Sequence, residues 1–246
     1  MIQTVYKKPA VINKPTTYCP GCSHGIINQV VASVIEEMGL VDDTILIDGV
    51  GCSTQMNIYW DVDALACEHG RAPAAATGVK RFNPDKLVFT YQGDGDLAAI
   101  GTTEIVHAAH RGEKFTVIYV NNAIYGMTGG QMAPTSLLGQ VTTTTPNGRT
   151  EEMYGSPIRM AELLATIDGA KFVERCSVDS PANIRKAKRA VKRAFECQMK
   201  GLGFSIVEFV AACPTNLGIT PVEAQNWVRE KMLPYYHIGN IKDYEG

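Results

Sequence analysis

The sequence predicts a doubly wound α/β protein whose sheet is mostly parallel. Short apolar runs rich in β-branched residues alternate along the chain with longer segments whose apolar residues recur at helical spacing. This alternation favours βαβ units, in which helices cover both faces of a parallel sheet. The chain has no internal repeat and no domain-scale linker, so we expect one domain over residues 1–246.

The predicted elements follow one another in a regular order. Strands are expected at 44–48, 64–68, 86–91, 115–120, 172–177 and 204–210. Helices are expected at 26–38, 72–80, 97–111, 158–167 and 182–198, with Pro221 in the first turn of a last helix. Residues 1–17 are expected to form an extended arm. The segment 132–156 is rich in Thr, Pro and Gly, and a loop of this length is usually functional.

The strongest site signal lies in the stretch 93–131. The strand at 86–91 leads into a Gly-Asp-Gly turn that contains Asp94, and the strand at 115–120 leads into an Asn-Asn pair that contains Asn122. Parallel strands of one βαβ unit end at the same edge of the sheet, so we expect these side chains to lie close together. Their oxygens suit a small hard cation such as Mg²⁺, and the adjacent glycines let a ligand approach the backbone.

The charge pattern around this turn indicates what the cation would do. Between residues 87 and 148 the only basic residues are Arg111 and Lys114, both expected beyond the far end of the helix. A bound diphosphate would therefore have no local lysine, unlike the diphosphate of a P-loop. An ordinary Asp-Gly turn and an unrelated Asn pair would give the same letters. Their placement at two strand ends favours a metal–diphosphate site.

Composition excludes several classes of protein. Hydrophobic residues make up 45% of the chain, charged residues 20%, and the net charge is −2, which gives no reason to expect nucleic acid or an anionic membrane as partner. No apolar run approaches the roughly 20 residues of a membrane span, and the first residues lack a signal-peptide core. We therefore expect a cytoplasmic protein. Seven cysteines, an odd number, do not fit a secreted disulfide framework.

The cysteines divide into two groups. Cys19 and Cys22 form a C-x-x-C motif, which alone is compatible with zinc, a redox dithiol or half of a cluster site. No second C-x-x-C exists, but Cys52 and Cys213 each follow a predicted strand. The remaining thiols stand in apolar or helical contexts and are expected to be buried and structural: Cys67, Cys176 and Cys197.

Two motifs resemble a known family. Gly-Asp-Gly, 25 residues, then Asn-Asn is similar to the thiamine-diphosphate fingerprint. Its continuation NNAIYGMTGGQMAPT, together with CPGCSHG near the start, resembles the β subunit of 2-oxoacid:ferredoxin oxidoreductases over about residues 18–217. The resemblance implies the diphosphate-binding type of thiamine-diphosphate fold, with a cluster-binding loop at about 16–25. Ser23 stands where the family has glycine, which affects loop flexibility more than ligation.

The resemblance also implies the site residues. A [4Fe–4S] cluster would be held by Cys19, Cys22, Cys52 and Cys213. Mg²⁺ would be bound by Asp94, Asn122 and the Ile124 carbonyl. The diphosphate and thiazolium would contact Gly51, Cys52, Ser53, Gly95, Asp96, Gly126 and Met127. The substrate would face Gln55, His69 and Gly129. His24 and His69 lie in glycine-flanked loops, and each fits either a structural role or a site role.

The implied reaction is oxidative decarboxylation of a 2-oxoacid to acyl-coenzyme A and CO₂, with ferredoxin as electron acceptor. In this family the glutamate that activates the coenzyme lies on a pyrimidine-binding α subunit, so we assign no general acid or base to this chain and expect a hetero-oligomer. The chain has no ferredoxin-type cysteine run, so further clusters would reside on small ferredoxin-like subunits.

Substrate preference rests on two uncharged positions, Gln55 and Gly129, where some relatives that accept 2-oxoglutarate place lysines. An unpaired second carboxylate would be costly there, whereas an aliphatic tail gains from burial. We expect a branched-chain substrate such as 2-oxoisovalerate, with 2-oxoglutarate as the alternative. Two other classes remain open: a non-redox thiamine-dependent decarboxylase subunit and a zinc-bearing structural module.

Overall fold

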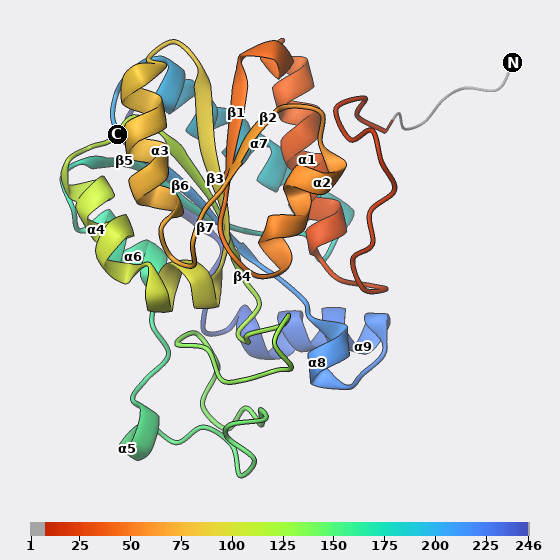
Figure 1. Ribbon diagram of the computed structural model, residues 1–246. Helices are drawn as coiled ribbons and strands as arrows, with labels where there is room; N and C mark the ends of the chain where they lie inside the picture. The colour runs from red at the N-terminus through yellow and green to blue at the C-terminus, as the bar shows by residue number, and fades with distance from the viewer. Residues whose placement is uncertain (1–7, 246) are drawn as a thin grey trace, which may run out of the picture.

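Seven strands form one twisted sheet in the computed structural model, which describes residues 8–245 (Figure 1). The strand order is β2-β1-β3-β4-β6-β5-β7, and every neighbouring pair is parallel except β5 with β7. The bounds are β1 Thr44–Asp48, β2 Asp63–Ala66, β3 Leu87–Gly93, β4 Thr116–Asn121, β5 Ala170–Ser177, β6 Phe204–Val210 and β7 Gly239–Lys242. The predicted mostly parallel sheet is confirmed.

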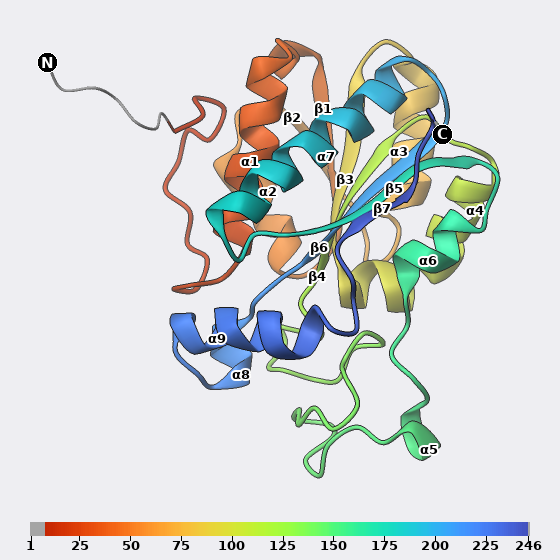
Figure 2. The same ribbon diagram turned by 180° about the vertical axis from the view of Figure 1, so that it is seen from behind.

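Helices cover both faces of this sheet. The longer ones are α1 His24–Glu37, α3 Ala72–Phe82, α4 Thr102–His110, α6 Met160–Ala165, α7 Pro181–Met199 and α9 Pro221–Trp227. The four-residue helices are α2 Met56–Tyr59, α5 Glu151–Tyr154 and α8 Pro214–Leu217. Figures 1 and 2 place α1 and α7 on one face and α3, α4 and α6 on the other, which is the doubly wound arrangement.

Each face has its own apolar core, and α7 illustrates how the sequence builds one. Ser180 caps the helix by accepting the Asn183 N–H, and Pro181 occupies the first turn. The buried residues of α7 recur at helical spacing, as an amphipathic helix requires, and Phe195 packs against Phe89 of β3. On the opposite face the rings of Phe115 and Phe204 meet edge to face.

The structure departs from the predicted elements mainly beside the sheet's carboxyl edge. The helix expected at 97–111 begins with a π-helical turn, Asp96–Ile100, and becomes α-helical only after Gly101. A Cβ at Gly101 would lie 2.7 Å from the Gly70 carbonyl oxygen, so close packing on a neighbouring loop accompanies the irregular turn. Short elements without a clear periodic signal were not predicted: α2, α8 and β7.

The N-terminal arm is packed rather than free over its described part. Val11 and Ile12 are buried, and Ile12 forms an antiparallel bridge with Trp60. The Val11 N–H also donates to the carboxylate of Glu36 on α1. The extended conformation expected for 1–17 is thus observed for residues 8–17 as a segment laid against α1 and α2, while residues 1–7 lie outside the described residues.

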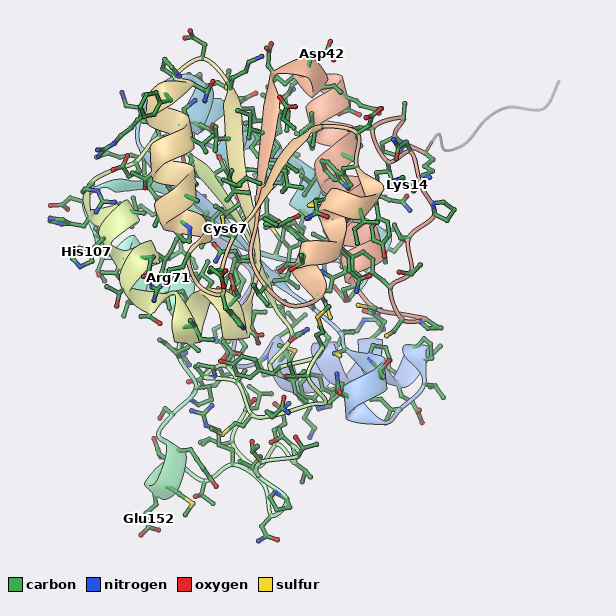
Figure 3. The ribbon with its side chains drawn as sticks, in the orientation of Figure 1. Lys14, Asp42, Cys67, Arg71, His107 and Glu152 are labelled. Atoms are coloured by element: carbon green, nitrogen blue, oxygen red, sulfur yellow. The ribbon has the colours of Figure 1, made fainter. Side chains whose placement is uncertain are left out.

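The carboxyl ends of β1, β3, β4 and β6 all open toward one end of the molecule, where the segment 132–156 projects (Figure 1). Figure 3 shows Glu152 at the tip of this projection and Asp42 at the opposite end of the sheet. The segment is irregular apart from α5, as its composition predicts. Within residues 8–245, no helix is long and apolar enough to cross a membrane.

Candidate functional site

A cleft lies just beyond the carboxyl ends of β1, β3 and β4. It encloses about 530 Å³ of empty space, part of it open to solvent. The predicted site residues that line it are Gly51, Cys52, Ser53, His69, Asp94, Gly95, Asp96, Asn122, Ile124, Gly126 and Met127. His24, Val50, Gly93, Tyr125 and Thr128 complete the lining. The fold thus brings predicted site residues as far apart in sequence as Gly51 and Met127 into one cleft.

Asp94 is a buried carboxylate with an ordered set of donors. Its Oδ1 accepts the Gly95 N–H at 2.9 Å, and its Oδ2 accepts the Thr135 hydroxyl at 2.5 Å. Burial raises its pKa to about 6, while Thr135 and nearby backbone N–H groups act in the opposite direction. No Lys or Arg lines the cleft. A buried anion with no cationic side chain beside it suits a bound cation.

The two asparagines after β4 have different roles. Asn121 turns inward, where its amide donates to Glu208, and Glu208 in turn forms an ion pair with the buried Arg175. Asn122 lines the cleft instead, and its Oδ1 accepts the Ile124 N–H at 3.3 Å. Ala123, between Asn122 and Ile124, has φ 58°, a conformation uncommon for a residue with a Cβ. This turn brings Asn122 and Ile124 to Asp94, as the fingerprint predicts.

Asp96 ties three loops together through its carboxylate. Oδ1 accepts from the Val50 N–H, the Gly70 N–H and His69 Nδ1, and Oδ2 accepts from the Gln92 amide. These protein donors occupy the carboxylate, so what Asp96 can offer a phosphate is its main chain in the first helical turn. His69 is fixed through Nδ1 at 2.6 Å, which leaves Nε2 as its unengaged nitrogen, on a side chain 32% exposed.

The structure gives a reason for glycine at position 95 that the sequence did not reveal. A Cβ there would lie 2.1 Å from the ring of Tyr125, and the Tyr125 hydroxyl donates to the Gly95 carbonyl. The glycine thus admits the Tyr125 ring, whereas a Cβ at Gly93 would meet nothing within 4 Å. Close approach of a ligand to the backbone is open at Gly93 and restricted by a protein ring at Gly95.

The four predicted cluster cysteines lie near one another, and one of them, Cys52, lines the cleft, whereas Cys19, Cys22 and Cys213 lie outside its lining. Cys52 begins the short 3₁₀ helix after β1, and Cys213 follows β6. Their sulfurs lie 3.7 and 3.6 Å from the position that a Cβ on Gly126 would occupy. Burial, together with proximity to Cys213, Cys52 and Cys19, raises the pKa of Cys22 to about 12.

The other three cysteines do not share one environment. Cys176 and Cys197 are buried, as expected, and all seven thiols are free. Cys67 was expected to be buried but is only partly so, because it follows the exposed edge strand β2. Figure 3 labels it beside the lower ends of the strands.

The donor types fit the two metal groups that the resemblance implies. In residues 8–245 no three His, Cys, Asp or Glu side chains are arranged to hold one metal ion. The implied Mg²⁺ site needs only one of these, the Asp94 carboxylate, together with amide and carbonyl oxygens. A cubane cluster binds each of four thiolates at a separate iron. The Ser53 hydroxyl, buried in the cleft wall and without a protein partner, is available to a ligand.

Some predicted residues lie outside the cleft lining. The Gln55 side-chain oxygen accepts from the hydroxyls of Thr17 and Tyr59, which ties it to the N-terminal arm. Gly129 is exposed in the turn after Met127. His107 projects from α4 away from the cleft (Figure 3). Two residues that support the site, Thr135 and Arg149, were not predicted from the sequence. Arg149 could have been noticed because it is the only Lys or Arg between residues 115 and 158.

Residues 49–209 match the family model described as thiamine pyrophosphate enzyme, C-terminal TPP binding domain. The chain belongs to this family, and its cleft occupies the carboxyl edge where parallel α/β sheets bind ligands. It is 46% identical over 228 residues to ketoisovalerate oxidoreductase subunit VorA of Methanothermobacter marburgensis, covering 93% of this chain and 48% of that protein. It is 38% identical over 216 residues to 2-oxoglutarate synthase subunit KorB of Archaeoglobus fulgidus, covering 88% and 76%.

A solved structure shares the fold along nearly the whole chain. The 2-oxoglutarate:ferredoxin oxidoreductase of Magnetococcus marinus, with 2-oxoglutarate, coenzyme A and succinyl-coenzyme A bound, superposes with a TM-score of 0.79 at 27% identity. The match covers 98% of this chain and 86% of that one. The chain is therefore a member of the thiamine-diphosphate-binding subunits of 2-oxoacid oxidoreductases, and it spans about half the length of the VorA relative.

Proposed function

We propose that this chain is the β subunit of a 2-oxoacid:ferredoxin oxidoreductase that uses thiamine diphosphate, Mg²⁺ and a [4Fe–4S] cluster. The observation that carries the proposal is the meeting of two ligand sets at one cleft. Asp94 and Asn122 supply oxygens on one side, and Cys52 and Cys213 supply thiols on the other. A non-redox thiamine enzyme would need only the oxygens, and a zinc module only the thiols.

The residues of the oxygen side have separable tasks in this proposal. Asp94, Asn122 and the Ile124 carbonyl would hold Mg²⁺, whose charge would neutralise a diphosphate that no lysine or arginine of the cleft can reach. The Ser53 hydroxyl and the main chain of Asp96 would donate to the coenzyme. The chemistry that the bound coenzyme supplies is cleavage of the bond between the 2-oxo carbon and its carboxylate.

The thiol side would give the electrons a route out of the cleft. Cys52 lines the cleft and lies beside Gly126. The Cys213 sulfur also lies beside Gly126. The absence of a side chain at Gly126 leaves the space next to both sulfurs open. A domain spanning 1–246 with a cluster-binding loop at about 16–25 is part of this proposal, with Cys19 and Cys22 as the loop's ligands.

The acidic side chains of the cleft support a role for a partner subunit. The acidic side chains in its lining are Asp94 and Asp96, and both carboxylates are already hydrogen-bonded within the chain. Neither is free to act as a general acid or base, so the glutamate that activates the coenzyme is proposed to come from a pyrimidine-binding α subunit. The isolated chain should then fail to reduce viologen with a 2-oxoacid and coenzyme A, and adding the α subunit should restore turnover.

The substrate is proposed to be a branched-chain 2-oxoacid such as 2-oxoisovalerate. Uncharged side chains dominate the mouth of the cleft, where the half-exposed Met127 offers an adaptable apolar wall. The second candidate is 2-oxoglutarate, the 2-oxoacid that appears in the name of the KorB relatives and is bound in the M. marinus structure. Comparing kcat/KM for 2-oxoisovalerate, pyruvate and 2-oxoglutarate on the whole complex decides between them, and a clear preference for 2-oxoglutarate would overturn the branched-chain assignment.

The cofactor assignment has its own test. Iron, sulfide and zinc analysis of the anaerobically purified complex separates the three classes of protein. Iron and sulfide in equal amounts, with Mg²⁺-dependent thiamine diphosphate binding, supports the oxidoreductase. Coenzyme binding without iron would indicate the non-redox enzyme, and zinc without coenzyme binding would indicate the structural module.

A further inference from the structure

Thr135 contacts the Asp94 carboxylate from a distant part of the chain. Its side chain is fully buried, and its hydroxyl donates to Oδ2 of Asp94 at 2.5 Å across 41 residues of sequence. The other carboxylate oxygen accepts the N–H of the next residue, Gly95, and the backbone N–H groups of Ala123 and Ile124 also stabilise the charged carboxylate. Among the described residues, Thr135 is the one whose hydroxyl donates to this carboxylate.

Arg149 fixes the backbone on both sides of Thr135. Its Nη1 donates to the carbonyls of Ala133, Pro134 and Ser136, at 3.2, 2.9 and 2.8 Å. Its other nitrogens donate to the carbonyls of Gly155, Tyr154 and Ser156. All six recorded bonds of this buried guanidinium go to main-chain oxygens, so it joins the start and the end of the segment 132–156.

The same segment also supports the second half of the predicted metal site. The Ser136 hydroxyl and the Gln140 amide both donate to the Ala123 carbonyl, at 2.6 and 2.9 Å. Ala123 is the positive-φ residue between Asn122 and Ile124. One short stretch, 135–140, thus contacts both the carboxylate after β3 and the turn after β4. The Tyr236 hydroxyl adds a further tie by donating to the Thr135 carbonyl.

We propose that Thr135, held in place by Arg149, is the positioning residue that orients the Asp94 carboxylate for the divalent cation of the coenzyme site. A hydroxyl donor on one oxygen and a backbone donor on the other keep the plane of the carboxylate fixed, and an ionised carboxylate with such donors retains lone pairs for a metal. Such outer contacts set the geometry and affinity of metal ligands. The segment 132–156 is then a clamp over the site, and its projection in Figure 1 is the outer part of that clamp. This inference rests on the proposed role of Asp94 in Mg²⁺ binding.

The test compares three threonine variants in the assembled enzyme, with Mg²⁺ affinity measured calorimetrically at saturating thiamine diphosphate. Thr135→Val removes the hydroxyl while keeping the side-chain shape, and should raise the Mg²⁺ Kd on the order of tenfold. Thr135→Ser keeps the hydroxyl and should restore Kd to near the wild-type value. Electron paramagnetic resonance of Mn²⁺ in the same site should report an altered ligand geometry in Thr135→Val alone.

Thr142→Val is the matched control. Thr142 is a buried threonine of the same segment, and its hydroxyl bonds to Thr145 rather than to a predicted metal ligand. It should lower the melting temperature without changing the Mg²⁺ Kd or the Mn²⁺ spectrum, which separates positioning from general loosening of the segment. Wild-type Mg²⁺ affinity in Thr135→Val, or a serine variant as weak as the valine one, would overturn the role of the hydroxyl.

Asp94→Asn separates failure of this inference from failure of the proposed function. Loss of Mg²⁺-dependent coenzyme binding in Asp94→Asn, with no change in Thr135→Val, would leave the metal site in place and remove Thr135 from it. Unchanged binding in Asp94→Asn would remove the metal site itself, and the inference with it.

Discussion

The two sides of the cleft are built by different means. On the oxygen side, Asp94 and Asn122 are buried and hydrogen-bonded to Thr135, Gly95 and Ile124 before any ligand arrives. On the thiol side, Cys19 is exposed and Cys22 and Cys52 are partly exposed, while the His24 N–H donates to Cys22 and Asn216 donates to Cys213. The chain organises the Mg²⁺ site through its own hydrogen bonds, whereas the cysteines gather near one another without a comparable network.

The difference follows from the chemistry of the ligands. A carboxylate must remain charged in the cleft, so the protein has to supply donors that stabilise it. Thiols are neutral when buried, as the raised pKa values of Cys22, about 12, and Cys52, about 11, indicate. They need no counter-charge until iron displaces their protons. The oxygen side should therefore keep its shape without metal, and the thiol side should acquire its order from the cluster.

The largest effect is expected from removing the metal carboxylate. Asp94→Ala leaves no anionic ligand for Mg²⁺ and leaves the diphosphate without neutralisation, so affinity for thiamine diphosphate should fall by more than about 100-fold. Titration calorimetry on the assembled complex, with Asp48→Ala as a buried carboxylate of the same sheet edge but outside the cleft lining, measures the effect. Equal affinity for thiamine diphosphate in wild type and Asp94→Ala would show that Asp94 is not part of a metal site.

The next effect is on the stability of the protein, through Arg149, which joins the two ends of the segment 132–156. Arg149→Met keeps the aliphatic length but leaves several buried carbonyls without a donor, at a cost of roughly 2–4 kcal/mol in the free energy of unfolding. Arg159→Met removes an exposed arginine that lies over the Tyr235 ring, and should cost less than about 1 kcal/mol. Denaturant unfolding compares the two variants, and equal losses in the free energy of unfolding would mean that the main-chain bonds of Arg149 do not stabilise the segment.

Removing the metals separately sharpens the comparison further. Chelation of Mg²⁺ should leave hydrogen-exchange protection of the Ala123 and Ile124 amides nearly unchanged, because these N–H groups donate to the side chains of Asn121 and Asn122. Anaerobic removal of iron should raise exchange in the loop 18–23, whose recorded backbone bonds are few. Greater loosening on the oxygen side than on the thiol side would reverse the contrast drawn here.

The pH dependence of stability is expected to reflect Asp48, a carboxylate at the same sheet edge with no metal assigned to it. Burial raises its pKa from the ordinary 3.8 to about 8, and its Oδ1 has no hydrogen-bond partner. The folded chain therefore keeps a proton that the unfolded chain releases above pH 4, so stability falls as pH rises from about 4 to 8. Asp48→Asn removes this dependence, and its melting temperature relative to wild type should be higher at pH 8 than at pH 5. A pH-independent difference would contradict the assignment.

The sequence predicted the frame of the site better than its supports. Strands 44–48 and 204–210 and the positions of Asp94 and Asn122 follow from periodicity and turn chemistry, which are local properties. Thr135, Tyr125 and Arg149 could not be assigned in that way, because their partners lie 41, 30 and up to 16 residues away along the chain. The partly exposed Cys67 was misjudged because β2, which reads as an apolar run, lies at the sheet edge.

The most direct test of the account is whether oxygens and thiols act together at one cleft yet bind different groups. In the anaerobically purified complex, Cys213→Ala should lose about four iron and four sulfide per copy of this chain, as expected for one [4Fe–4S] cluster. It should still bind thiamine diphosphate in a Mg²⁺-dependent manner, and the buried control Cys197→Ala should keep both. Full iron content in Cys213→Ala, or zinc in place of iron in the wild type, would contradict the account.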